Sequence, residues 1–308
     1  MRLNDNQLFF QDSINETSSH FKIAQEYVEK DYWLYLILKE IFKNSENGYV
    51  FKGGTSLSKC FHLINRFSED IDISYSTSYE VLTVGGVRKK FEDIIKAIER
   101  AGLKVSNREN LRSRRYFNQF LCPYESIVEK QNDNIERKVI VELAAQTPSF
   151  PSETKVFSSF IYDYFKSINR KDLIEKYDLE PFPIQVQTLE RTLVDKTFAI
   201  CDYYISDNIK QHSRHIYDIS KLLSVINLNE GLAKLFLEVR EYRNKIPICL
   251  SARDGIKLNE ILNNIISLKS FKADFEKVTY QFLYEDYTYK KCEESLIKLK
   301  DFLVSNNL

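Results

Sequence analysis

The sequence predicts an α+β protein, with an α/β domain over residues 1–185 and a helical domain over residues 186–308. Two observations lead to this fold class. In the first domain, short segments rich in β-branched and aromatic residues alternate with stretches of helical periodicity. Beyond the proline-flanked stretch PFPIQVQT (181–188), which marks a boundary, almost every segment has its apolar residues at helical spacing.

The first predicted elements surround a pair of glycines. Residues 22–43 carry apolar residues at helical spacing and are expected to form a helix. We expect YVFKGG (49–54) to be a short strand that ends in the glycines and TSLSKCFHLI (55–64) to be a short helix. EDIDISYS (69–76) then has the alternation of a strand with two different faces.

The middle of the chain adds a helix and further strands. After a second glycine pair, residues 87–102 are expected to form a helix that Gly102 terminates. Strand-like segments follow at 103–107, 114–124 and 137–146, the last dense in β-branched residues. In the second domain, helices are expected at 188–205, 213–226, 229–245, 257–268 and 288–305.

The composition is that of an ordinary globular protein and points to no membrane and no charge-driven partner. Lys+Arg and Asp+Glu number 44 each, so any nucleic-acid surface must be a local patch. The five cysteines are far apart and form no CxxC pair, which predicts reduced thiols rather than disulfides or zinc ligands. The chain opens without a secretory pattern and has no apolar run of about 20 residues, so a cytoplasmic location is expected.

Asp70 and Asp72 are the first candidates for chemistry. Residues i and i+2 of a strand point to the same face, so the two carboxylates converge and repel each other unless a cation lies between them. Oxygen ligands of this kind suit Mg²⁺, with Mn²⁺ as a substitute. An isolated Asp-x-Asp is more often a solvated strand end, so this pair alone is weak evidence.

The glycine turn strengthens the hypothesis. Gly53 and Gly54 lead into Thr55 and Ser56 at a helix start, which offers free N–H groups and hydroxyls to an anion. A tight turn with a helix cap explains the same residues without any ligand. With the carboxylates close behind, however, the order resembles a nucleoside-triphosphate site that lacks a Walker sequence. Arg66 and Ser68 could add phosphate contacts.

Glu142 is the candidate for a third carboxylate. It lies between Val141 and Leu143 in a predicted strand, and an acid among apolar strand residues needs a partner or a function. Metal binding or general-base catalysis is one interpretation. An ion pair at the strand edge with Arg137 or Lys138 is the other.

The stretch FKGGTSLSKCF…RFSEDIDI resembles the first motif of the AbiEii/AbiGii toxin family, nucleotidyltransferases of the DNA polymerase β-like superfamily. The family pattern is GG-(T/S)-x-L-x-K/R, a short spacer, and then R-x-S-x-D-hydrophobic-D. It is matched by Gly53, Gly54, Thr55, Leu57, Lys59, Arg66, Ser68, Asp70 and Asp72. The preceding EKDYWLYLILKEI is similar to the helix that these toxins place before the motif.

Two later motifs are also similar to this family. TLERTLVDKTFAI contains Glu190 and Lys196, and SRHIYDISKLL contains Arg214, His215 and Asp218. From the residues alone, Lys196 could be a surface lysine or part of a structural ion pair. The resemblance implies instead that Lys196 and Asp218 of the helical domain reach the catalytic cleft, with Lys196 on the triphosphate.

The resemblance implies a polymerase β-like mixed sheet flanked by helices, and a Mg²⁺-dependent toxin of a toxin–antitoxin or phage-defence system. Asp70, Asp72 and Glu142 would hold the metal, with Lys196 and Asp218 completing the catalytic set. The NTP would be bound by Gly53, Gly54, Thr55, Ser56, Lys59, Arg66, Ser68 and Arg214. A cognate antitoxin is implied as a partner.

The acceptor of the nucleotide is expected to be RNA, in particular the 3′ end of tRNA, as in some relatives. A basic stretch could contact it, although a solvated helix and loop explain the same residues: Arg88 to Lys90, Arg108, Arg112, Arg114 and Arg115. Alternatives are a small-molecule or protein hydroxyl as acceptor, or a nucleotide-binding regulator without turnover. The intact Asp70/Asp72 pair argues against the regulator.

Overall fold

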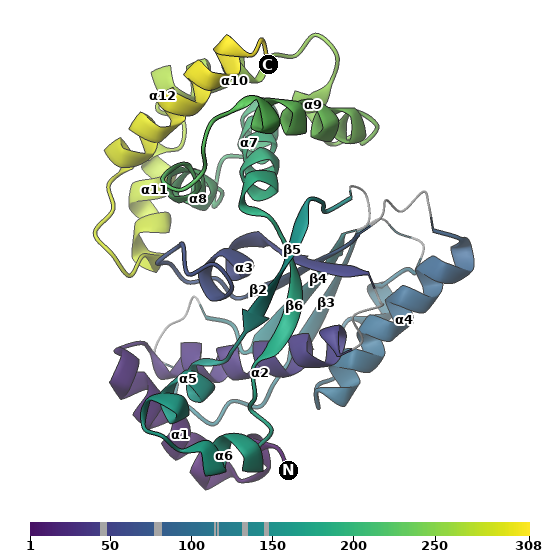
Figure 1. Ribbon diagram of the computed structural model, residues 1–308, viewed down its shortest axis with the longest axis vertical. Helices are drawn as coiled ribbons and strands as arrows, with labels where there is room; N and C mark the ends of the chain where they lie inside the picture. Colours follow the sequence, from purple (N-terminus) through teal and green to yellow (C-terminus); the bar gives the residue numbers. More distant parts are fainter. Residues whose placement is uncertain (44–47, 77–81, 114, 116, 131–134, 145–147) are drawn as a thin grey trace. The chain divides into compact units, whose positions relative to one another are not determined.

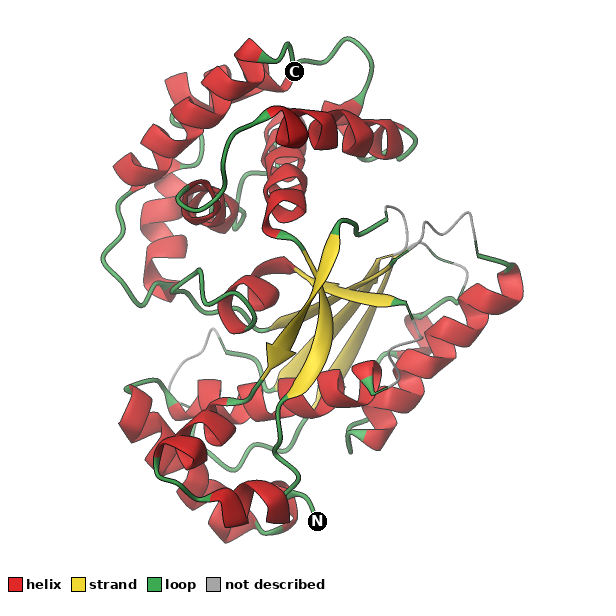
Figure 2. Cartoon of the chain, in the orientation of Figure 1, coloured by secondary structure: helices red, strands yellow, loops and turns green. Residues whose placement is uncertain are grey.

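A computed structural model describes residues 1–308 except 44–47, 77–81, 114, 116, 131–134 and 145–147. The chain divides into two units, each described here by itself. The sheet unit comprises Met1–Cys60, Glu69–Pro148 and Ser152–Val186, and the helical unit comprises Phe61–Ser68, Ser149–Pro151 and Gln187–Leu308. The predicted α+β class is confirmed, since a mixed sheet and many helices make up the described residues (Figure 2).

The described residues of the sheet unit form a six-stranded sheet of order β3-β4-β2-β1-β6-β5 (Figure 1). Its strands are β1 (Tyr49–Lys52), β2 (Asp70–Tyr75), β3 (Phe117–Pro123), β4 (Lys138–Ala144), β5 (Ser152–Phe157) and β6 (Phe182–Gln187). Strand β1 pairs antiparallel with β2 and parallel with β6. Strand β4 pairs parallel with β2 and antiparallel with β3.

Helices pack on this sheet and on one another. They are α1 (Gln7–Phe21), α2 (Gln25–Phe42), α3 (Gly53–Lys59), α4 (Val84–Arg100), α5 (Phe160–Ser167) and α6 (Lys171–Lys176), with 3-10 turns at Leu3–Asp5 and Arg108–Asn110. Helix α2 packs against α1, α4 and α5 and reaches β4, while α3 packs on β1 and β2. Burial alternates along β2 and β4: Ile71, Ile73, Val139 and Val141 are fully buried, and the intervening positions are only half-buried. The half-buried face is the one that carries the acidic residues.

The helical unit consists of helices around its own apolar core. They are α7 (Leu189–Ile205), α8 (Arg214–Leu223), α9 (Glu230–Asn244), α10 (Leu258–Ser267), α11 (Lys272–Lys277) and α12 (Tyr289–Ser305), with 3-10 turns at Leu250–Ala252 and Thr279–Phe282. Helix α7 packs against α8, α9 and α10, and α12 packs against α8 and α10. Phe198, Phe236 and Leu299 are fully buried in this core. No helix among the described residues has the length and apolar character needed to cross a membrane.

Two secondary-structure predictions need correction. Residues 103–107 do not form a strand; the Ser106 N–H donates one hydrogen bond of 2.9 Å to the Leu121 carbonyl at the side of β3. The helix predicted over 55–64 begins earlier, at Gly53, and ends at Lys59. The stretch 181–188, interpreted as a boundary, contributes strand β6 to the sheet.

Candidate active site

The predicted acidic residues lie in one row across the sheet. Strand register places Asp72 opposite Lys52 on β1 and opposite Glu142 on β4, and Glu142 in turn lies opposite Gln119 on β3. Directly opposed residues share a face of a sheet, so Asp72 and Glu142 are neighbours. Asp70, two residues before Asp72, belongs to the same face.

Glu142 is the acid whose ionisation the surroundings change most clearly. Burial and the neighbouring negative charge of Asp72 raise the pKa of Glu142 to about 7, and Asp70 adds to the effect. The Gln119 amide donates a 3.0 Å hydrogen bond to Glu142 Oε1 and opposes this rise only in part. At pH values below about 7, Glu142 therefore holds a proton beside Asp72, in a position where a cation could replace it.

Gly53 makes the approach of Asp72 possible. Its φ of +80° is a left-handed conformation that favours glycine, and a Cβ on Gly53 would overlap the Asp72 carboxylate. The buried hydroxyls after it bond to the main chain: Thr55 Oγ1 donates to the Asp70 carbonyl (2.7 Å) and Ser56 Oγ to the Gly53 carbonyl (2.9 Å). The turn thus holds the start of β2 against the end of β1.

Lys59 has a different position from the one predicted for a triphosphate ligand. Its Nζ lies 2.7 Å from Asp31 Oδ1 on α2 and 3.6 Å from the centre of the Phe160 ring. The Phe160 N–H also donates to Asp31, at 2.7 Å. Because its side chain is only 10% exposed and already paired, Lys59 joins α3 to α2 and α5 within the sheet unit.

In the helical unit, Asp218 on α8 is shared by two cations. Arg66, on the loop before β2, donates from Nε and Nη2 to the two Asp218 oxygens, each at 2.7 Å. Lys196 on α7 lies 2.7 Å from Asp218 Oδ2. All three side chains are buried, with Asp218 completely enclosed. The structure therefore confirms neither Arg66 nor Asp218 as a ligand contact and places Arg66 in an ion pair that the sequence did not indicate.

The electrostatics of this cluster leave an excess of positive charge. Burial alone would raise the pKa of Asp218, but Arg66 and Lys196 outweigh it and hold that pKa well below its ordinary value. Burial lowers the pKa of Lys196, and the attraction of Asp218 opposes this in part. Two cations and one carboxylate carry a net positive charge, which a bound anion would neutralise.

His215 also contacts Lys196. Its Nδ1 lies 3.4 Å from Lys196 Nζ, and burial, followed by the Lys196 charge, lowers the pKa of His215 well below its ordinary value. A neutral imidazole can accept a hydrogen bond from the ammonium at Nδ1 when its proton is on Nε2. Sequence reasoning did not find this contact, since no pattern distinguishes His215 from a residue on a solvated helix face.

Two further residues were predicted to bind the NTP, Ser68 and Arg214. Ser68 is half-buried in the loop before β2, and Arg214 is exposed at the start of α8. Across the described parts of the chain, no three His, Cys, Asp or Glu side chains converge closely enough to hold a metal ion. The oxygen-only pair Asp72–Glu142 nevertheless fits Mg²⁺, which binds through one or two carboxylates and keeps several waters.

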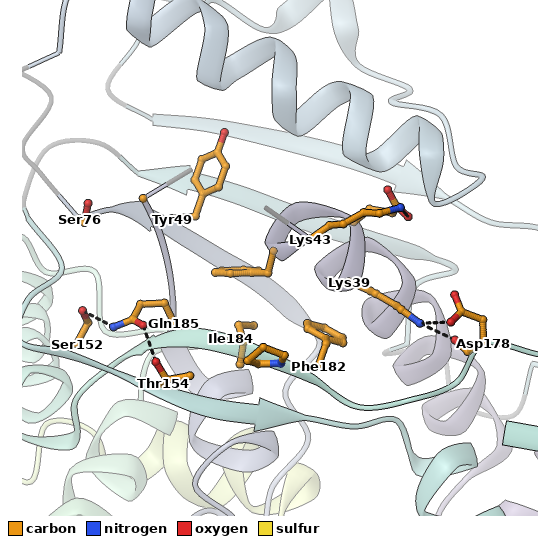
Figure 3. A pocket seen from close by; sticks show the side chains of 14 residues that line it. Lys39, Lys43, Tyr49, Ser76, Ser152, Thr154, Asp178, Phe182, Ile184 and Gln185 are labelled. Atoms are coloured by element: carbon orange, nitrogen blue, oxygen red, sulfur yellow. Dashed lines mark hydrogen bonds and ion pairs between the residues drawn. The ribbon is translucent and has the colours of Figure 1, made fainter. Parts of the chain in front are cut away.

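A pocket of about 730 Å³ in the sheet unit contains none of the predicted site residues. Tyr49 at the start of β1 lines it, whereas the acidic row lies at the other end of that strand. Figure 3 shows that several of its polar side chains bind one another, with Lys39 on Asp178 (2.9 Å) and Gln185 on Ser152 (2.9 Å). The chemistry of the acidic row, rather than the size of this pocket, identifies the candidate site.

Comparison with known proteins gives an independent result. The family model described as "Nucleotidyl transferase AbiEii toxin, Type IV TA system" matches residues 36–290. No curated protein gave a significant match to the chain. The matched range begins within α2 and ends within α12, so it includes both the acidic row and the Asp218 cluster.

Proposed function

Because the chain belongs to the AbiEii nucleotidyltransferase toxin family, we propose that it is a Mg²⁺-dependent enzyme that transfers a nucleotide from an NTP to RNA. The acceptor we propose is the 3′ end of tRNA, and pyrophosphate is the other product. The observation that carries this proposal is the Asp72–Glu142 pair, whose charges need a proton or a cation between them.

The sheet unit would supply the metal site. Asp72 and Glu142 would bind Mg²⁺, with Asp70 on the same strand face as the next oxygen donor. When bound, the metal would lower the pKa of the acceptor hydroxyl and neutralise charge on the phosphates. Glu142 would give up its proton on metal binding, because the cation favours the ionised carboxylate.

The helical unit would supply cationic groups for the triphosphate. Lys196 has three N–H donors: one lies on Asp218, one faces His215, and the third would serve a phosphate oxygen. Arg66 would act as a positioning residue by fixing the Asp218 carboxylate that orients Lys196.

One experiment tests the acceptor. The purified protein is incubated with Mg²⁺, each labelled NTP in turn and total RNA, and the label is followed by size. We expect label on tRNA-sized species from wild type and none from Asp72→Asn. Label confined to protein or to a small molecule would exclude the RNA acceptor, and nucleotide binding without pyrophosphate release would exclude catalysis.

A further inference from the structure

A second groove of the sheet unit has three arginines in its lining. It has a volume of about 450 Å³ and lies between α4 and the segment around the 3-10 turn Arg108–Asn110. Arg88 projects from the second turn of α4, and Arg108 and Arg112 come from the other segment. Glu92 is the acidic residue among the lining residues. Three arginines from two segments and one glutamate thus line the same groove.

These arginines remain accessible to a ligand. Arg88 is exposed, and no described residue forms an ion pair or hydrogen bond with its side chain. Arg108 is 54% exposed, and its contacts with Glu92 (3.5 Å) and Glu99 (3.4 Å) are both long. Arg112 is exposed as well, while its Nη1 donates to the Glu109 carbonyl (2.6 Å) and the Leu111 carbonyl (2.8 Å). These last bonds hold the Arg112 guanidinium in place and leave its other donors available.

The arrangement suits phosphates that are joined in a chain. An arginine presents a planar fork of donors that matches phosphate oxygens, and separated arginines can each meet a different phosphate of a backbone. We propose that this arginine groove binds the phosphodiester backbone of the RNA acceptor. The inference rests on the proposed RNA acceptor and adds the surface that would hold it.

Binding of fluorescein-labelled bulk tRNA, followed by anisotropy at several KCl concentrations, tests the groove. Arg88→Ala and Arg112→Ala should each weaken binding about 2- to 5-fold, as expected for an exposed charge pair. Each should also reduce the magnitude of the negative slope of log K against log[KCl] by about 1, because one phosphate contact is lost. Glu92→Gln should strengthen binding by a similar factor, since it removes the carboxylate that competes with the RNA.

Arg100→Ala is the matched control. Arg100 is an exposed arginine on the same helix, paired with Glu40 at 2.8 Å and absent from the groove lining. It should leave both the affinity and the salt slope unchanged. Equal effects of Arg100→Ala and Arg88→Ala, or no change in Arg88→Ala and Arg112→Ala, would overturn the inference.

Experiments can contradict the groove inference and the proposed reaction independently of each other. If wild type labels RNA but the groove variants bind and are active like wild type, the groove inference is wrong and the reaction stands. If the groove variants lose RNA affinity while wild type labels no RNA in the transfer assay, the groove stands and the proposed acceptor reaction is wrong.

Discussion

Arg66 and Asp218 are 152 residues apart in the chain and form a two-pronged, buried ion pair. The pair ties the loop that leads into β2 to helix α8. Lys196 binds the same carboxylate, so removal of Asp218 would leave two buried cations without a counter-charge, whereas removal of Arg66 or of Lys196 would leave a single ion pair.

Arg66→Ala should lower the free energy of unfolding by about 3 kcal/mol, near the lower end for breaking a buried pair, because Lys196 still compensates Asp218. Urea denaturation measures this loss. Arg214→Ala removes an exposed arginine of α8 and should change the stability by about 0.5 kcal/mol or less. Equal stability of the two variants would contradict a structural role for Arg66.

Glu142 should make stability pH-dependent when no divalent cation is present. Its folded-state pKa of about 7 lies above the ordinary 4.5, so its favourable contribution is complete below pH 4.5 and is lost as the pH rises through 7. At about 1.4 kcal/mol per pH unit, the loss reaches up to about 3 kcal/mol. Thermal melts from pH 4 to 8 should show this loss of stability in wild type but not in Glu142→Gln.

Addition of Mg²⁺ should reverse that loss. A cation bound between Asp72 and Glu142 favours the ionised form, so Mg²⁺ should raise the melting temperature of wild type at pH 8 more than at pH 5. EDTA should remove the increase. An equal Mg²⁺ effect in wild type and in Glu142→Gln would show that the cation binds elsewhere.

Gly53→Ala should abolish nucleotide transfer, because the new Cβ would displace the Asp72 carboxylate. The left-handed backbone adds a cost of about 1 kcal/mol or more to folding. For the stability effect alone, Gly85→Ala is the control, since a Cβ there meets open space in a helix and should stabilise by up to about 1 kcal/mol. Normal transfer by Gly53→Ala would exclude Asp72 from the metal site.

His215 should affect NTP binding by accepting a hydrogen bond from Lys196 at Nδ1. His215→Leu removes the hydrogen bond to Lys196 and should raise the KM for NTP about 5-fold, the equivalent of one hydrogen bond of about 1 kcal/mol. His215→Asn keeps an acceptor near the same place and should restore most of the affinity. Similar KM values for the Leu and Asn variants would indicate packing rather than hydrogen bonding.

The sequence predicted those features of the structure that depend on residues close together in the chain. Alternation along residues 69–76 predicted that Asp70 and Asp72 share a face, and Gly102 predicted the end of α4. Register between strands is not a local property, so the sequence suggested Glu142 as a third acid but did not indicate that it lies opposite Asp72. The family resemblance that was inferred from the three motifs is confirmed by the match over 36–290.

The predicted pairing of Lys196 with Asp218 is confirmed, but the ion pairs of Lys59 and Arg66 could not be predicted, for the same reason. Lys59 matched a family pattern, but its partner Asp31 lies on an earlier helix, and nothing in the intervening sequence connects the two. Arg66 was assigned to phosphate on its proximity to Asp70 in the chain, whereas tertiary packing gave it Asp218. Of the predicted basic stretch, Arg114 lies outside the described residues.

The loop 61–68 has a consequence for how the protein can be dissected. It leaves the sheet unit after Cys60, joins the helical unit, and returns at Glu69, so neither unit is a continuous piece of chain. A fragment that stops at Val186 would keep Arg66 but lose Asp218, and a guanidinium that is normally enclosed would face an apolar gap or water. A fragment that ends at this boundary would also lack Lys196, so we expect it to be less stable and less active than the full chain.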